Sequence, residues 1–335
     1  MVDVKQLTPL SYQLGEGPYW DETNQYLLFV DIMKGDVHRH YPDNLKQQTI
    51  HVDNSKQQTI HVEEGPTGDS VSFALPVEGK PSYLVVGLGR SLALVEWPLD
   101  APDTLTVKAK AILHSVDQHS PTNRFNDGKC DPMGRIWAGT MAAETAPGVL
   151  AKHKAALYTL NTDLSIATGV DKISLSNGLA WNKEATTMYY IDSTDYAIYA
   201  FNYNAASGKI DNRRTVLDYK AASLGDDIPD GMTIDNNGNL WVANFYGHKV
   251  ICIDPQVGKI IRQVSLPASN ITSVCWGGTD YSTLYVTSSQ VGISEDKVRT
   301  DKAQGGVFAV TGLGAQGAPP TNFKVDLSLL KSKIN

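Results

Sequence analysis

Cysteine is scarce in this chain: three cysteines occur in 335 residues, so they cannot all pair with one another. Cys130, Cys252 and Cys275 each lie among apolar residues, which is typical of buried, reduced thiols rather than of a disulfide framework. The N-terminal sequence MVDVKQLTPL has no basic stretch followed by an apolar one. We therefore expect no secretion signal and a cytoplasmic protein.

Long apolar runs and basic clusters are also lacking. No apolar run reaches the roughly 18 residues of a membrane-spanning helix, so we expect no membrane partner. The formal net charge is −7 and Lys and Arg form no cluster, which argues against a nucleic-acid partner. The sequence contains no G-x-S-x-G motif, which disfavours a serine nucleophile.

Glycine and proline are plentiful, with 28 and 16 residues, and they separate many short apolar segments. The clearest run spans residues 228–265, where turns at Asn237-Gly238 and Tyr246-Gly247 divide apolar, β-branched stretches. The predicted strands are Gly231–Asp235, Leu240–Asn244, Lys249–Asp254 and Lys259–Ser265. Four strands with two apolar faces need similar units as neighbours.

Such units recur along the chain. Each opens with a polar residue, followed five positions later by Asp or Asn, and three openings, Asn126, Asn177 and Asp230, are 51 and 53 residues apart. Another unit opens at Glu16, and two degenerate units lie near residues 70–96 and 272–288. Six units of this size predict an all-β, six-bladed β-propeller with four-stranded antiparallel blades around a central axis, as a single domain over 1–335.

Four further expectations concern the edges and connections of the blades. Residues 2–10 should pair with the last blade, which also includes a strand within 305–311, and remove an open edge. A ten-residue duplication at 45–64 should lengthen the outer edge of the first blade. The segment 101–117 should connect the second and third blades, and the long connection 142–154 should reach over a site.

The first polar residue of each unit should lie at one end of the innermost strand, so these side chains converge at one mouth of the channel. They are Glu16, Asn126, Asn177 and Asp230. Two carboxylates and two carboxamides in register favour a hard cation such as Ca²⁺, Mg²⁺ or Mn²⁺ over a tetrahedral structural zinc. The alternative is that they only cap strands or turns.

A second recurrent set, Asp21, Asp131, Asn182 and Asp235, should form turns between the first two strands of each unit. Trp20, Trp137, Trp181 and Trp241 are interpreted as packing residues of the blades.

Four motifs resemble the signatures of the senescence-marker-protein/gluconolactonase/luciferin-regenerating family: GEGP at 15–18, NRFNDGK at 123–129, SNGLAW at 176–181 and PDGM at 229–232. The resemblance implies lactonase activity on sugar lactones and one divalent metal ion, Ca²⁺, Mg²⁺, Mn²⁺ or Zn²⁺. It assigns the metal to Glu16, Asn177 and Asp230. It assigns the sugar to Arg124 and Asn126, and Glu144 resembles the family's substrate-contacting glutamate.

The expected reaction is metal-assisted hydrolysis of aldonolactones to aldonic acids by a monomer or weak dimer, with Asp230 as general base. Arg124 would hold a ring hydroxyl or the developing oxyanion. Three alternatives stay open: a Ca²⁺-binding regulatory protein without turnover, a luciferin-regenerating or organophosphate-hydrolysing relative with the same metal, and a propeller that is a scaffold for protein partners.

Overall fold

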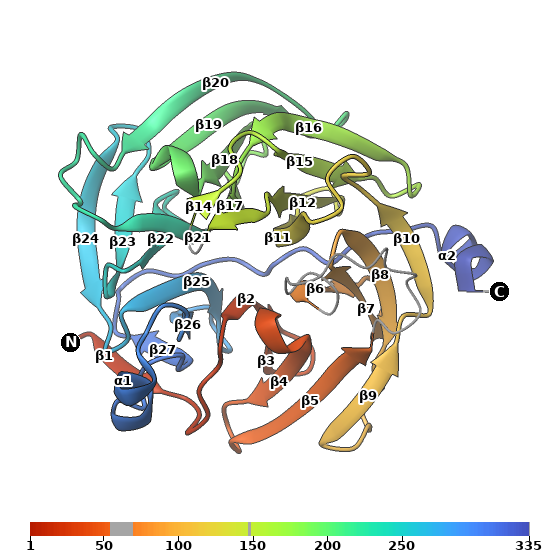
Figure 1. Cartoon of the computed structure of the whole chain (residues 1–335), viewed down its shortest axis with the longest axis horizontal. Coiled ribbons are helices and arrows are strands. Elements are labelled where there is room, and N and C mark those ends of the chain that lie inside the picture. The colour runs from red at the N-terminus through yellow and green to blue at the C-terminus, as the bar shows by residue number, and fades with distance from the viewer. Residues whose placement is uncertain (54–69, 147–148, 335) are drawn as a thin grey trace. The chain divides into compact units, whose positions relative to one another are not determined.

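The computed structural model describes residues 1–53, 70–146 and 149–334, and most of them lie in β-strands. The strands form four- and five-stranded sheets arranged as a six-bladed β-propeller, as the sequence predicts (Figure 1). Within the described residues the α-helices are short: α1 (Glu295–Thr300) and α2 (Leu327–Ile334). No helix among them is long and apolar enough to cross a membrane.

The chain forms two compact units. The first unit comprises Met1–Phe29, Arg39–Lys46 and Asn177–Pro320. The second unit comprises Val30–His38, Gln47–Ser176 and Thr321–Asn335.

The first unit is built mainly from three four-stranded sheets. Their strand orders are β17-β18-β19-β20, β21-β22-β23-β24 and β25-β26-β27-β1. The strands of the first two sheets are β17 (Ser176–Trp181), β18 (Thr187–Asp192), β19 (Ala197–Asn204), β20 (Lys209–Asp218), β21 (Ile228–Ile234), β22 (Leu240–Phe245), β23 (Lys249–Asp254) and β24 (Lys259–Ser265). Those of the third are β25 (Asn270–Gly277), β26 (Thr283–Ser289), β27 (Phe308–Thr311) and β1 (Asp3–Gln6).

The four strands predicted within 228–265 are all present, two of them with the predicted bounds. Only β21 differs by more than one residue, because it begins at Ile228 rather than at Gly231. The N-terminal pairing is also confirmed, since β1 runs antiparallel to β27 with Val4 opposite Val310.

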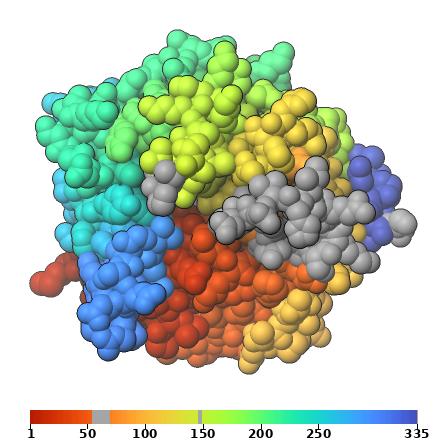
Figure 2. Space-filling view, in the orientation of Figure 1, coloured from red at the N-terminus to blue at the C-terminus, as the bar shows by residue number. Residues whose placement is uncertain are grey.

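The last strand of a sheet is more exposed than its first strand. In β17 every residue is buried, whereas most residues of β20 are exposed. Figure 1 shows β20 as the outer strand of its sheet, and Figure 2 shows this green part of the chain at the surface. The early strands therefore read as continuous apolar runs, as expected for strands covered on both faces.

The second unit contains two four-stranded sheets and a small hairpin. The sheets have the orders β6-β7-β8-β10 and β11-β12-β15-β16. Their strands are β6 (Val71–Val77), β7 (Lys80–Leu88), β8 (Ser91–Glu96), β10 (Ala111–Ser115), β11 (Arg124–Cys130), β12 (Ile136–Met141), β15 (Ala155–Leu160) and β16 (Ile166–Ile173). The predicted connection at 142–154 contains the hairpin of β13 (Glu144–Ala146) and β14 (Val149–Leu150).

The remaining sheet corrects two expectations. Its order is β2-β3-β4-β5-β9, with β2 (Gly15–Asp21), β3 (Tyr26–Asp31), β4 (Asp36–Tyr41), β5 (Lys46–Asp53) and β9 (Thr104–Lys108). The first copy of the duplication forms β5, which is not the outermost strand because β9 pairs with it in parallel. The second copy lies outside the described residues. The segment 101–117 is not a plain connection, because it supplies both β9 and β10.

The second recurrent polar set forms turns, as predicted. Asp235 Oδ1 accepts hydrogen bonds from the backbone N–H groups of Asn237 and Asn239, and its Oδ2 accepts from Trp241 Nε1 at 3.0 Å. Asp131 makes the equivalent bonds in the second unit, including one from Trp137 Nε1 at 3.1 Å. Each aspartate thus connects a turn to a buried tryptophan of the following strand.

Candidate functional site

The first strands of four of the six blades carry a predicted polar residue near their start. We call β2, β6, β11, β17, β21 and β25 the leading strands. Glu16 lies on β2, Asn126 on β11, Asn177 on β17 and Asp230 on β21. All four are buried, with exposed fractions of 3% for Asn177, 6% for Glu16, 7% for Asp230 and 8% for Asn126.

Irregular pairing recurs at these positions. The register of β11 with β12 shifts between Phe125 and Asp127, and that of β21 with β22 shifts between Pro229 and Met232. Both shifts fall on a predicted polar residue, Asn126 or Asp230. A bulge adds a residue to one strand and redirects its side chain, which explains how a polar group departs from the apolar pattern of these strands.

Three leading strands of the first unit approach one another closely beside the predicted metal residues. A Cβ on Gly178, which follows Asn177, would lie 2.8 Å from the backbone oxygen of Asp230. A Cβ on Gly231 would lie 2.1 Å from Ser273 Oγ. Only glycine permits these approaches. The glycines of the Asn177-Gly178 and Asp230-Gly231 pairs are therefore required for strand packing, while Asn177 and Asp230 supply the polar groups.

Thr272 Oγ1 of β25 donates to the backbone oxygen of Gly15 at 2.6 Å. The contacts therefore run from β17 through β21 and β25 to β2, at the level of Asn177, Asp230 and Glu16. The first unit thus holds all three residues that the resemblance assigns to the metal.

The carboxamide of Asn177 fits a cation ligand. Its Nδ2 donates to Ser193 Oγ at 2.8 Å, while its buried Oδ1 has no hydrogen-bond partner among the described residues. A buried amide oxygen without a partner is costly, and a hard cation is a partner that compensates it. Two buried carboxylates in the same unit would also gain from a cation.

No three His, Cys, Asp or Glu side chains in the described part of the chain are grouped as a metal-binding set. A metal held by Glu16 and Asp230 would consequently need the amide oxygen of Asn177 as a further protein ligand. Such an all-oxygen set suits Ca²⁺, Mg²⁺ or Mn²⁺ better than it suits a thiolate- or imidazole-bound ion.

The predicted sugar-binding residues of the second unit are already organised. Arg124 Nη1 donates to the backbone oxygen of Phe125 at 2.8 Å and to Asn126 Oδ1 at 3.0 Å. Asn126 Nδ2 donates to the backbone oxygen of Ser176 at 2.9 Å. Both ends of the Asn126 amide are engaged, in contrast to Asn177, which favours a role other than metal binding.

Glu144 lies on β13 and its side chain is exposed. Within the described residues the Glu144 side chain has no hydrogen bond or ion pair with Arg124 or Asn126. The end of the connection 142–154 is held in place, because Asn123 Nδ2 donates both to Lys154 O and to Asp117 Oδ2, at 2.7 Å each.

Sequence reasoning missed two polar residues of this region. Asp127 follows Asn126 directly, and burial raises the pKa of its carboxyl group although Gly128 N–H donates to it at 2.7 Å. The carboxylate of the NDGK motif, directly after Asn126, was the available signal. Ser193 lies in the 3₁₀ turn Ser193–Asp195 after β18, and nothing in the sequence marks its contact with Asn177.

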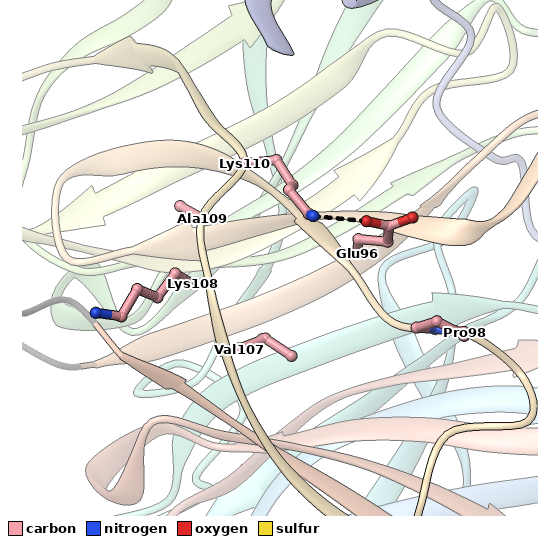
Figure 3. Close-up of a pocket in the computed structure, with 6 residues that line it drawn as sticks. All are labelled: Glu96, Pro98, Val107, Lys108, Ala109 and Lys110. Carbon is pink, nitrogen blue, oxygen red and sulfur yellow. Dashed lines mark ion pairs between the residues drawn. The ribbon is translucent and has the colours of Figure 1, made fainter. Parts of the chain in front are cut away.

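A surface pocket of the second unit is separate from these residues. It has a volume of about 370 Å³ and is lined by Glu96, Pro98, Val107, Lys108, Ala109 and Lys110 (Figure 3). Lys110 Nζ lies 2.7 Å from Glu96 Oε2, while Lys108 points away from this pair. Because Glu96 and Lys110 form an ion pair and no lining residue is a predicted site residue, the pocket is not the candidate site.

The fold and these residues define a class of protein. It is a β-propeller in which four leading strands carry a buried carboxylate or carboxamide near their start. The family model described as the SMP-30/Gluconolactonase/LRE-like region matches residues 14–290. The chain belongs to this family.

Individual relatives and a solved structure are consistent with this family membership. Regucalcin of Xenopus laevis is 41% identical over 313 residues, which cover 93% of this chain and 95% of that protein. Regucalcin of Homo sapiens is 37% identical over 322 residues, or 96% and 98% of the two chains. A luciferin-regenerating enzyme structure aligns with a TM-score of 0.83 at 34% identity, covering 97% of this chain and all of that one. These similarities support a lactonase-like or calcium-binding function.

Proposed function

We propose that this protein is a divalent-metal-dependent lactonase that hydrolyses sugar aldonolactones to aldonic acids. The observation that carries the proposal is the buried Asn177 Oδ1, which lacks a hydrogen-bond partner among the described residues and shares a unit with the buried carboxylates of Glu16 and Asp230. The family match and the four motifs that resemble the family's signatures support it.

Glu16, Asn177 and Asp230 would hold the ion, which would supply Lewis-acid polarisation of the lactone carbonyl. Asp230 would take a proton from the attacking water as that oxygen bonds to the carbonyl carbon. The bond from this carbon to the ring oxygen then breaks, and the proton passes to the ring oxygen, which becomes a hydroxyl group. The product is the open-chain aldonic acid.

Arg124 would donate a charge-assisted hydrogen bond to a ring hydroxyl or to the developing oxyanion. Its existing bonds to Phe125 O and Asn126 Oδ1 hold the guanidinium in one orientation. Asn126 and Glu144 would bind further sugar hydroxyls.

The principal alternative is a Ca²⁺-binding protein without turnover, which is favoured by the regucalcins among the similar proteins. Such a protein would need Glu16, Asn177 and Asp230 but not Arg124 or Glu144. Gluconolactone hydrolysis by variants at these two positions therefore separates the two functions.

Arg124→Ala and Glu144→Ala should each lower kcat/KM for gluconolactone by roughly ten- to a hundredfold, the cost of one charge-assisted hydrogen bond. Calorimetric titration should show nearly unchanged metal affinity. Arg213→Ala, which removes an arginine packed over Tyr199, and Glu184→Ala are matched controls that should keep wild-type kcat/KM. Wild-type rates for both site variants would contradict the lactonase assignment and favour the binding protein.

A further inference from the structure

One feature recurs beside every predicted polar residue of the leading strands. The backbone oxygen of the residue just before it accepts a hydrogen bond from a side chain of another sheet or its turn. The pairs are Thr272 Oγ1 to Gly15 O at 2.6 Å, Ser72 Oγ to Phe125 O at 2.5 Å, Asn126 Nδ2 to Ser176 O at 2.9 Å, and Ser193 Oγ to Pro229 O at 2.6 Å. These hydrogen bonds therefore hold the leading strands in place along their length, next to Glu16, Asn126, Asn177 and Asp230.

Ser193 differs from the other donors because it contacts one predicted metal residue, Asn177, and the backbone directly before another, Asp230. Its hydroxyl donates to Pro229 O, directly before Asp230, and accepts from Asn177 Nδ2 at 2.8 Å. Ser193 is itself buried, with 1% exposed.

The direction of these bonds fixes the orientation of the Asn177 amide. A serine hydroxyl has one hydrogen, and a carbonyl oxygen can only accept, so the Ser193 hydrogen is committed to Pro229 O. The hydroxyl can then only accept from Asn177, which requires the NH₂ end of the amide to face Ser193 and Oδ1 to face away from it. A flipped amide would set two acceptors against each other.

From this geometry we propose that Ser193 is a positioning residue for the cation: it orients Asn177 Oδ1 and keeps Asn177 and Asp230 in register. The inference rests on the metal site of the proposed function. Groups that orient a metal ligand typically contribute ten- to a hundredfold to affinity.

The test is calorimetric titration of Ca²⁺ into metal-stripped protein. Ser193→Ala should weaken binding about ten- to a hundredfold. Its melting temperature without metal should fall no more than that of Ser269→Ala, which removes another buried serine hydroxyl of the same unit. Ser193→Thr retains a hydroxyl and should restore most of the affinity. Should the alanine variant not fold, Ser193→Cys replaces the hydroxyl by a weak donor and should also lose affinity.

A double-mutant cycle identifies the route of the effect. Asn177→Asp presents an oxygen in either orientation, so Ser193→Ala should cost much less in that background than in the wild type. Equal costs in both backgrounds, or wild-type affinity in Ser193→Ala, would overturn the inference.

The two failures are distinguishable. If Asn177→Ala and Asp230→Ala lose Ca²⁺ while Ser193→Ala binds it like wild type, only the role of Ser193 is wrong. If the wild-type protein binds no divalent cation, the metal site fails and Ser193 with it.

Discussion

At the scale of single residues, the two asparagines of the leading strands have different hydrogen-bonding environments. Asn126 uses both ends of its amide, toward Arg124 and Ser176, whereas Asn177 uses only its nitrogen. The sequence places both in the same position of the repeat and cannot separate them. The separation depends on neighbours from other sheets, and these neighbours are remote in the sequence.

A buried histidine gives the fold a pH dependence. Burial, with a smaller effect of Lys34, lowers the pKa of His38 from 6.5 to about 3. The folded protein thus keeps His38 neutral, while the unfolded chain takes up a proton below about pH 6.5. The contribution of His38 to stability is complete above pH 6.5 and decreases as the pH falls toward 3.

Replacing this histidine should reduce the acid sensitivity. His38→Asn retains a polar partner for Thr49 Oγ1, which lies 2.9 Å from His38 Nδ1, but cannot be protonated. From pH 7 to pH 5 the variant should lose about 2 kcal/mol less unfolding free energy than wild type. Urea unfolding at both pH values measures this difference. Gln48→Asn, at a buried side chain of β5 that carries no ionisable group, is the control and should leave the pH dependence unchanged.

At the scale of elements, local signals predicted the four strands within 228–265 and the turns between them. Asn-Gly turns, β-branched segments and the Asp or Asn five residues after each opening depend on neighbours in sequence. Three of the four strands within 228–265 therefore agree with the prediction to within one residue, and β21 begins three residues earlier. The parallel partner of β5 could not be found in this way, because β9 lies more than 50 residues further along. The short β13–β14 hairpin likewise has no distinct pattern.

The turn between β21 and β22 depends on Asp235. Asp235→Ala removes the acceptor of two backbone N–H groups and of Trp241 Nε1, and should cost about 2–4 kcal/mol. Asp235→Asn retains one oxygen but places an NH₂ group against the indole N–H, so it should also destabilise, by about 1–3 kcal/mol. Asp163→Ala, in an exposed turn with Ser165, should cost clearly less than either Asp235 variant. Equal stability of all three variants in urea would contradict this role.

The N-terminal strand completes a sheet that would otherwise end at β27. Val4→Pro removes a backbone donor opposite Val310 and should separate β1 from β27. We expect unfolding followed by tryptophan fluorescence and by circular dichroism to lose coincidence, because part of the sheet opens first. Val4→Ala keeps the backbone donor, and its two transitions should still coincide. Coincident transitions in Val4→Pro would show that β1 is dispensable.

At the scale of the whole molecule, a propeller of apolar sheets carries a few buried polar groups on its leading strands. The repeat and the motifs predicted the fold class and the family, because both depend on patterns within about 50 residues. The arrangement of polar atoms depends on contacts between sheets, such as Ser193 to Pro229. Its chemistry can therefore be tested only on the folded chain.

The central claim is that one divalent cation, held by Glu16, Asn177 and Asp230, is required for lactone hydrolysis. The most direct measurement is the rate of gluconolactone hydrolysis by metal-stripped protein as Ca²⁺, Mg²⁺, Mn²⁺ or Zn²⁺ is added back, in parallel with Asp230→Ala. We expect negligible activity without metal. With at least one of these metals, the rate should rise and saturate at about one ion per chain. Asp230→Ala should stay folded and inactive at every concentration. Full activity of the stripped protein, or activity of Asp230→Ala equal to wild type, would contradict the claim.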